Sequence, residues 1–206
     1  MGKVRRVTRR FRFPAPEDDS WHWFEVGAAG QVLRQITFRG PDSVPVVAAE
    51  PVEVAQTRQA CGEWGVRLYE VVYGVPVREP VVEPPGARSV DPREFDVAWG
   101  RARSFRQCHV RHDTGPLPVG TRLTGTFTAS PWGPGVTGVF VDVGLPAAGF
   151  VDASVLLRAE CAWPADGTPA EFEVVDLRVG VGRPQIRLRP TAVPAPGEPW
   201  PRHGPW

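Results

Sequence analysis

Cys108, His109, His112 and Asp113 form the densest group of side chains in this chain that could bind a metal ion. Zinc sites are built from cysteines and histidines at recurring short spacings, usually completed by a second cluster. Two histidines three residues apart beside one cysteine match no such spacing, and the sequence offers no second cluster. We therefore predict no metal site and interpret this stretch as a solvated link between domains.

The sequence motifs that commonly carry catalysis are missing. There is no GxSxG, no GxxxxGK(S/T) and no HExxH, and the sequence places no pair of carboxylates in a pocket. Residues 133–138 fit the GxGxxG pattern of dinucleotide sites, but a predicted strand follows them where such a site requires a helix. We therefore predict neither an enzyme nor a bound cofactor.

Positive charge is carried mainly by arginine, since Lys3 is the only lysine in the chain. The planar guanidinium group stacks on bases and forms paired hydrogen bonds to phosphate. A GC-rich genome also favours arginine codons, and we prefer that simpler explanation of the bias. The formal net charge of +1 lacks the basic excess of a strong nucleic-acid binder, so any such binding must be local.

The cysteines Cys61, Cys108 and Cys161 are odd in number and widely spaced, which indicates reduced thiols rather than a disulfide framework. The charged N-terminus is not followed by the apolar stretch of a signal peptide. No apolar run in the sequence reaches the length of a membrane span. We expect a soluble cytoplasmic protein with no membrane partner.

Residues 1–75 are expected to form a small α+β unit. Its basic N-terminal segment alternates in a way that predicts an edge strand, with a solvated terminus or an arm for nucleic acid as alternatives. Two β-prone runs on either side of residues 27–30 predict a hairpin. The hairpin residues Trp21, Trp23 and Phe24 could stack bases, but we expect them in the core of the sheet.

The segment after Pro51 predicts two short helices, although its valine-rich runs could also form strands. In each helix, four residues at helical spacing would share one face. The first face comprises Val52, Ala55, Gln59 and Ala60, and the second comprises Val66, Tyr69, Val72 and Tyr73.

Residues 76–90 are rich in proline and predict an extended linker. The next residues, Asp91, Pro92 and Glu94, combine an N-cap, a proline at the first helical position and an acid three residues after the cap. They predict a connecting helix over residues 91–107. Its apolar residues repeat at helical spacing and should pack on a neighbour: Phe95, Ala98, Trp99, Ala102 and Phe105.

From residue 117 to residue 191 the sequence changes to short alternating runs. They predict five strands, with a helical turn between the third and the fourth, over residues 122–128, 137–144, 148–152, 170–177 and 185–189. This order is that of a small Greek-key barrel of the oligonucleotide-binding type, or OB-fold. The predicted fold class is thus an α+β N-terminal unit joined to an all-β five-stranded Greek-key barrel. Residues 192–206, with five prolines, are expected to be a disordered tail.

Four segments of this barrel resemble the S1 RNA-binding domain. That family carries Gly-x-Val, then Gly-Ala-Phe-Val-x-hydrophobic-Gly, then Gly-Leu-Val-His-x-Ser, and finally Arg-Ile-x-Leu-Ser. The counterparts follow in the same order, at residues 125–127, 138–144, 149–154 and 185–189. The resemblance implies that single-stranded RNA binds the outer face of the second and third strands, through aromatic rings that stack on bases and basic residues that meet phosphates.

Strand alternation places Phe140 and Asp142 on one face of the second strand, opposite its valines. In the last strand, Gln185, Arg187 and Arg189 share a face opposite Ile186 and Leu188. Together with the resemblance, this alternation implies one RNA-binding face. Its residues are Trp132, from the loop before the second strand, with Phe140, Phe150, Arg187 and Arg189.

Some positions depart from the family pattern. Its first stacking aromatic is Thr137 here, the histidine of its third strand is Asp152, and the first arginine of its last strand is Gln185. Residues 117–191 also hold six basic and seven acidic residues. We therefore expect weak, salt-sensitive RNA binding of low sequence specificity.

A protein-interaction or regulatory role is the alternative, in which the barrel is a scaffold and a protein partner binds the N-terminal unit. The hairpin faintly resembles small bacterial domains with a WFEVD-like opening, some of which lie near toxin and immunity genes. Here the corresponding residues are Trp23, Phe24, Glu25 and Val26.

Overall fold

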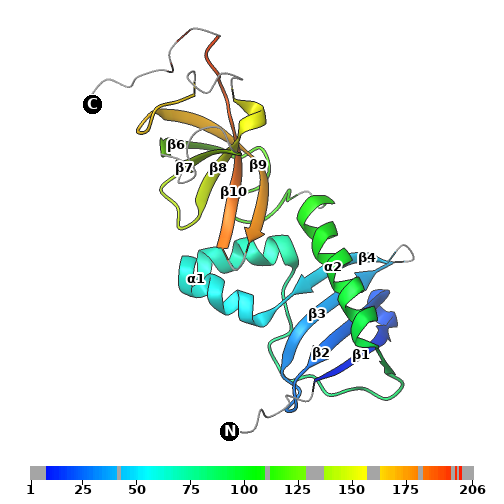
Figure 1. Cartoon of the computed structure of the whole chain (residues 1–206). Coiled ribbons are helices and arrows are strands. Elements are labelled where there is room, and N and C mark those ends of the chain that lie inside the picture. Colours follow the sequence, from blue (N-terminus) through cyan, green and yellow to red (C-terminus); the bar gives the residue numbers. More distant parts are fainter. Residues whose placement is uncertain are drawn as a thin grey trace. The chain divides into compact units, whose positions relative to one another are not determined.

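The computed structural model describes residues 8–40, 43–109, 112–128, 137–156, 163–180, 183–195, 198 and 200. The chain divides into two compact units, one of residues 1–59 with 69–110 and one of residues 60–68 with 111–206. Each unit contains a five-stranded sheet, and helices are few (Figure 1). The predicted fold class, an α+β unit joined to an all-β unit, agrees with the structure at the level of two five-stranded sheets and few helices. None of the helices in the described ranges has the length and hydropathy of a membrane span.

The first unit is built on an antiparallel sheet in the order β4-β3-β2-β1-β5. Its strands are β1 (Arg9–Ala15), β2 (Ser20–Val26), β3 (Val32–Arg39), β4 (Val44–Ala49) and β5 (Arg88–Ser89), with a short 3-10 helix, η1 (Pro16–Asp18), after β1. The predicted hairpin is the pair β2 and β3. The predicted edge strand is instead an inner strand that begins at Arg9, because β5 pairs along its other side.

The helix α2 (Pro92–His109) covers one face of this sheet and begins where the sequence predicts. The Asp91 carboxylate accepts a hydrogen bond from the backbone N–H of Arg93 at 2.8 Å. Phe95 and Ala102 are fully buried against Trp23 and Ile36 of the sheet. The segment predicted as a connector is therefore part of the hydrophobic core of the N-terminal unit.

The other face of the sheet is covered by the proline-rich segment of residues 76–90. Val81 and Ala87 pack against a cluster of buried residues that includes Phe11 and Phe24. The backbone N–H of Val81 also donates to the carbonyl of Gly30 at 2.8 Å. The predicted linker is therefore held on the sheet, because it shields an apolar face that would otherwise meet water.

The helix α1 (Pro51–Tyr73) contains a break at Gly62, whose φ of 63° and ψ of −165° are not helical. The segment is thus helical in two pieces, as predicted. The predicted second face is correct, since Val66, Tyr69, Val72 and Tyr73 are buried. The first is wrong: Val52 is 53% exposed, whereas Val54 is buried. Spacing alone does not tell which face of a helix meets its neighbours.

The second unit contains a closed barrel in the order β10-β8-β7-β6-β9. Neighbouring strands are antiparallel except β8 and β10, which are parallel. The elements are β6 (Arg122–Thr128), β7 (Gly138–Asp142), β8 (Ala148–Asp152), the 3-10 helix η2 (Ala153–Val155), β9 (Pro169–Gly180) and β10 (Arg183–Pro190). The five predicted strands and the helical turn after the third are all present.

Aromatic rings fill part of the barrel interior. Phe127 and Phe172 are fully buried, with ring centres 5.1 Å apart. Trp200 lies 5.2 Å from Phe127 and is only 8% exposed, although it belongs to the segment expected to be disordered. The indole of this segment thus completes the aromatic core of the barrel.

Candidate nucleic-acid interface on the barrel

The outer face of the barrel carries four of the five residues that the sequence predicts for RNA binding. In β7, Val139 and Val141 are buried and Phe140 is half-buried on the outside. In β10, Ile186 and Leu188 are buried while Arg187 and Arg189 point outwards. The predicted alternation is therefore correct in both strands. Trp132 lies outside the described residues.

Phe140, Phe150 and Arg187 form one continuous row across three neighbouring strands. The register pairs Phe140 directly with Phe150, and Phe150 directly with Arg187. The two phenyl rings meet edge to face, with centres 5.3 Å apart and planes at 72°. The guanidinium carbon of Arg187 lies 4.4 Å from the centre of the Phe150 ring. The fold thus brings three of the predicted residues into direct contact.

Phe150 itself is only 6% exposed, because Phe140 and Arg187 cover it. A buried ring cannot stack on a base, so its role differs from the one that the sequence predicts. Instead it supports the two groups above it. The surfaces that remain open to a flat ligand are the half-buried Phe140 ring and the guanidinium group of Arg187.

Arg187 is held in place by two polar contacts. Its Nη1 donates to Gln185 Oε1 at 3.0 Å, and its Nη2 donates to Asp152 Oδ2 at 3.2 Å. Burial lowers the pKa of Arg187, and Arg178 lowers it further, while Asp152 and Asp176 oppose the change. An arginine in a protein nevertheless stays protonated at neutral pH. The guanidinium is therefore a fixed cation with one carboxylate already bound.

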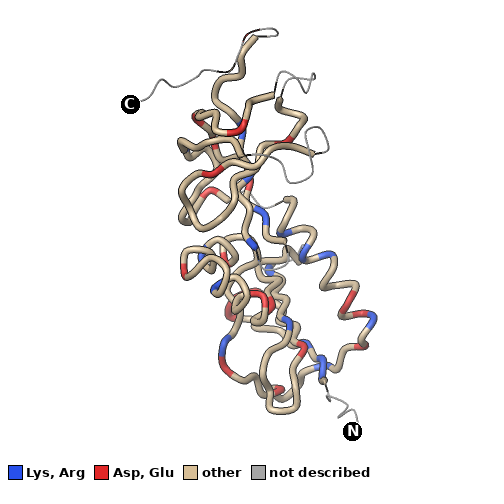
Figure 2. The backbone as a smooth tube through the Cα atoms, turned by 60° about the vertical axis from the view of Figure 1, so that its left-hand side comes forward, with Lys and Arg blue, Asp and Glu red and all other residues tan. Residues whose placement is uncertain are grey.

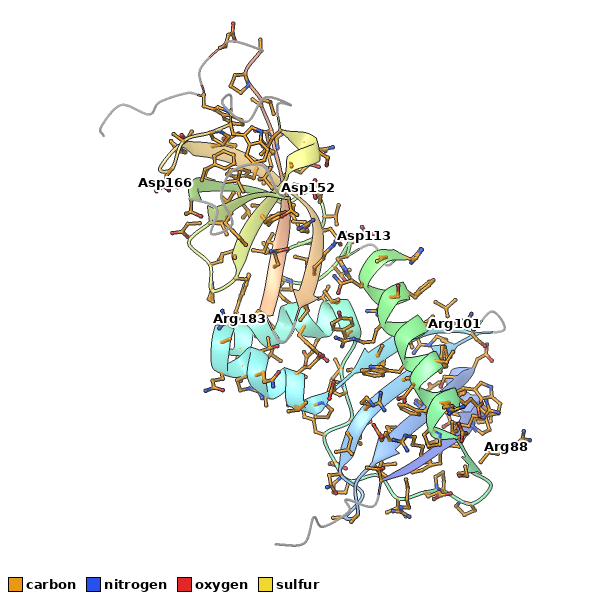
Figure 3. The ribbon with its side chains drawn as sticks, viewed as in Figure 1. Arg88, Arg101, Asp113, Asp152, Asp166 and Arg183 are labelled. Carbon is orange, nitrogen blue, oxygen red and sulfur yellow. The ribbon has the colours of Figure 1, made fainter. Side chains whose placement is uncertain are left out.

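Asp152 lies at the end of β8 (Figure 3). Hydrogen bonds from the backbone N–H and the hydroxyl of Ser154 lower the pKa of the Asp152 carboxyl, and Arg187 lowers it further. The backbone bond, from Ser154 N to Asp152 Oδ1, is 2.9 Å long. Asp152 is therefore anionic at neutral pH and competes with any phosphate for Arg187.

Two further arginines of this surface are also paired. Arg189 contacts Glu173 at 3.1 Å, and Arg178 contacts Asp176 at 3.1 Å. Basic and acidic positions are interspersed along the chain (Figure 2). Arg178, Arg187 and Arg189 thus each have a carboxylate partner, so this surface has little excess positive charge.

Arg178 and Asp176 are residues of this surface that sequence reasoning missed. They reach the row because β9 pairs with β10, which sets Asp176 opposite Arg187 and Arg178 opposite Gln185. The pairing depends on the register of two long strands with an irregularity after Arg187. The charged residues of β9 are visible in the sequence, but they do not show which residues of the neighbouring strand lie opposite them.

The cysteine and histidine group beside α2 does not come together as a ligand set in the part of the chain that the structure describes. No group of three potential metal ligands occurs there. Cys108 is exposed, whereas His112 is buried. A comparison with known protein families and with curated proteins found no match to this chain.

Proposed function

We propose that the second unit is an oligonucleotide-binding barrel of the S1 type that binds single-stranded RNA in the cytoplasm, weakly and with little sequence preference. The strand order supports this assignment. Three consecutive antiparallel strands, β6, β7 and β8, are followed by β10 parallel to β8, and β9 closes the barrel on β6. That connectivity is the one expected of a Greek-key OB barrel.

The observation that carries the proposal is the contact of Arg187 with Phe150 beside Phe140. A base can stack on the Phe140 ring, and a second can stack on the guanidinium plane of Arg187. Stacking of this kind contributes roughly 1–3 kcal/mol per base and tolerates every base, because each has a π-face. Low sequence specificity follows from this mode of binding.

Weak binding follows from the ion pairs. A phosphate that approaches Arg187 must displace Asp152 or share the arginine with it. The same holds for Arg189 and Glu173. Fewer counterions are then released on binding, so the affinity still falls as salt rises but less steeply than it would for a basic groove. Stacking should therefore contribute more of the binding free energy than phosphate contacts do.

The test is fluorescence anisotropy of a short labelled single-stranded RNA, titrated with the full chain at about 50 and about 200 mM salt. The double variant Phe140→Ala plus Arg187→Ala should bind about tenfold or more weakly, because it loses both stacking surfaces. Arg67→Ala removes the same charge from an exposed position on α1 and should bind as the wild type does. Equal binding by the wild type and the double variant would exclude this surface.

The second candidate is a protein-interaction scaffold, which the neutralised arginines favour. A surface whose cations already have carboxylate partners suits a protein partner as well as it suits RNA. Affinity purification of the full chain after ribonuclease treatment separates the two. A single stoichiometric protein that persists after this treatment, together with no RNA binding, would support the scaffold role.

A further inference from the structure

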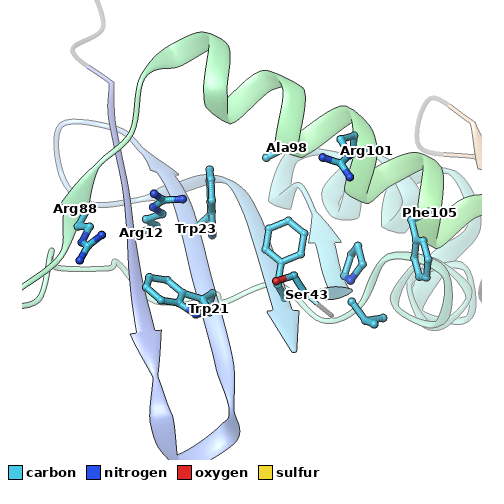
Figure 4. A pocket seen from close by; sticks show the side chains of 11 residues that line it. Arg12, Trp21, Trp23, Ser43, Arg88, Ala98, Arg101 and Phe105 are labelled. Atoms are coloured by element: carbon cyan, nitrogen blue, oxygen red, sulfur yellow. The ribbon is translucent and has the colours of Figure 1, made fainter. Parts of the chain in front are cut away.

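The N-terminal unit contains a hollow of about 700 Å³ between α2 and one end of the sheet (Figure 4). Ligand sites in proteins commonly span about 300–1,000 Å³. Two rows of the sheet form its floor: Trp21 pairs with Phe38, and Arg12 pairs with Trp23. The helix α2 forms its wall with Ala98, Arg101 and Phe105, which share one helical face. Both surfaces belong to a single unit.

Trp21 is the unusual residue of this hollow. Trp23, two residues along the same strand, packs in the cluster under α2 and is 8% exposed. Trp21 lies on the same face but is 39% exposed, because it lines the hollow beyond that cluster. The expectation that both tryptophans lie in the core is thus correct for Trp23 and wrong for Trp21. An exposed indole in a concave aromatic site is a surface on which a planar ring can stack.

The charge of the hollow is positive. Arg12, Arg88 and Arg101 line it, and none of the described lining residues is acidic. Arg12 is paired with Glu94 at 3.3 Å and lies over the Trp23 ring at 4.7 Å. Its Nε is buried without a hydrogen-bond acceptor among the described residues.

Arg88 and Arg101 are different from Arg12. Both are exposed, and neither side chain has a hydrogen-bond or ion-pair partner in the described part of the chain. Figure 4 shows them at opposite sides of the hollow, with Trp21 and Trp23 between them. These two cations are therefore available to an anionic ligand, unlike the paired arginines of the barrel.

We propose that this hollow binds a nucleotide unit, with the base stacked on Trp21 and phosphates bound by Arg88 and Arg101. Cations on both sides of a stacking surface suit a nucleotide that carries phosphate on each side of its ribose. Such a unit occurs within a single-stranded RNA and in a free nucleoside 3′,5′-bisphosphate. The site is independent of the barrel surface and does not require the barrel to bind RNA.

An acidic peptide is the competing ligand, and the floor argues against it. Trp21, Trp23, Phe38 and Phe105 contribute four aromatic rings to the lining. Carboxylate side chains can pair with the arginines but offer no planar ring for the indole. A nucleotide uses both features at once, because its base meets the ring while its phosphates meet the guanidinium groups.

The test is isothermal titration calorimetry of the full chain with adenosine 3′,5′-bisphosphate, adenosine 5′-monophosphate, a short single-stranded RNA and an oligoglutamate peptide. Trp21→Ala and the double variant Arg88→Ala plus Arg101→Ala should each weaken bisphosphate binding about tenfold or more. Arg39→Ala removes one charge from an exposed residue next to Phe38 and should leave binding within about twofold of the wild type. Unfolding midpoints of all variants establish that the fold is retained.

Loss of bisphosphate binding in the pocket variants, with tighter binding of the bisphosphate than of the monophosphate, is the expected result. Tighter binding of RNA than of bisphosphate identifies nucleic acid as the ligand, and the reverse order identifies a free nucleotide. The proposal is overturned by no binding of any nucleotide, by equal binding in the pocket variants and Arg39→Ala, or by preference for oligoglutamate. The barrel variant Phe140→Ala plus Arg187→Ala should keep full bisphosphate binding, which separates failure of this proposal from failure of the barrel site.

Discussion

The guanidinium carbon of Arg187 lies 4.4 Å above the centre of the Phe150 ring, and the parallel register of β10 and β8 pairs the two residues directly. The ring is buried beneath the cation, and Asp152 binds the cation from the side at 3.2 Å. The guanidinium group of Arg187 is therefore a stacking surface whose positive charge Asp152 neutralises.

Asp152→Asn should strengthen RNA binding. The change releases Arg187 from its ion pair, while the amide oxygen can still accept the hydrogen bond from Ser154 N–H. We expect the affinity for single-stranded RNA to rise about threefold to tenfold. The slope of log K against log salt should steepen by about 0.7 if Arg187 then meets one phosphate. Anisotropy titrations across several salt concentrations measure both quantities.

Asp166→Asn is the matched control for that charge change, because Asp166 is exposed in the turn before β9 (Figure 3). It should produce a smaller gain in affinity and no change in the slope. Equal gains in the two variants would mean that overall charge, and not release of Arg187, determines the affinity.

Gly138→Ala should destabilise the barrel strongly. Gly138 has a φ of 153°, and a Cβ at this position would lie 2.0 Å from the carbonyl oxygen of Val151 and 2.7 Å from the Phe150 ring. Neither the strand backbone nor the buried ring can move without loss of pairing or packing. We expect the free energy of unfolding to fall by about 3 kcal/mol or more in urea titrations.

Gly144→Ala provides the comparison for backbone strain alone. Gly144 also has a positive φ, of 68°, but a Cβ there would meet open space. Its cost should be about 1–2 kcal/mol, the cost of an unfavourable backbone conformation. If both variants lose the same free energy, the close contact at Gly138 contributes nothing.

Glu25→Gln should destabilise the N-terminal unit. The Glu25 side chain is 8% exposed and pairs with Arg10 and with Arg34, the latter at 2.5 Å. Arg34 also pairs with Asp96 of α2 at 2.8 Å. Removal of the central charge leaves Arg10 without its carboxylate, and we expect a loss of about 3 kcal/mol in the free energy of unfolding. Chemical denaturation followed by circular dichroism provides the measurement.

Glu79→Gln makes the same substitution at an exposed residue and should change the free energy of unfolding by less than about 0.5 kcal/mol. A loss at Glu25 no larger than this would show that the ion pairs and their desolvation cost cancel.

His22 should make the stability depend on pH. Its ring nitrogens form hydrogen bonds with Ser20 Oγ at 3.2 Å and with Thr37 Oγ1 at 3.1 Å. Burial lowers the pKa of His22 from 6.5, although Asp18 and Glu17 partly oppose the change. The unfolded chain therefore binds the proton more readily than the folded chain does. The contribution of His22 to stability is present above pH 6.5 and declines as the pH falls below it.

His22→Gln removes this titration while leaving a side chain that can form hydrogen bonds. The difference in unfolding midpoint between wild type and variant should therefore shrink from about pH 7.5 to about pH 5.5. Midpoints that shift in parallel for the two proteins across this range would contradict the assignment to His22.

Several features of the fold follow from local sequence signals. The Asp91 cap and Pro92 predicted the start of α2, and alternation in β7 predicted that Phe140 lies outside while Val139 and Val141 lie inside. These signals work because a cap or an alternating run acts within a few residues, whatever the rest of the chain does. The five strands of the barrel and the helical turn after the third were predictable for the same reason.

The tertiary structure alone decided what each exposed group can contact. Alternation put Arg187 on the outside and the family resemblance put Phe150 there, but only the register of β8 and β10 buries the ring under the cation. Likewise, Arg88 of a proline-rich segment reaches Arg12 only because β5 pairs with β1. Contacts between distant strands depend on register and coverage, which are set by the whole core rather than by neighbouring residues. The sequence therefore determined most of the elements and the inner faces of the barrel strands, and the packing determined which outer residues form sites.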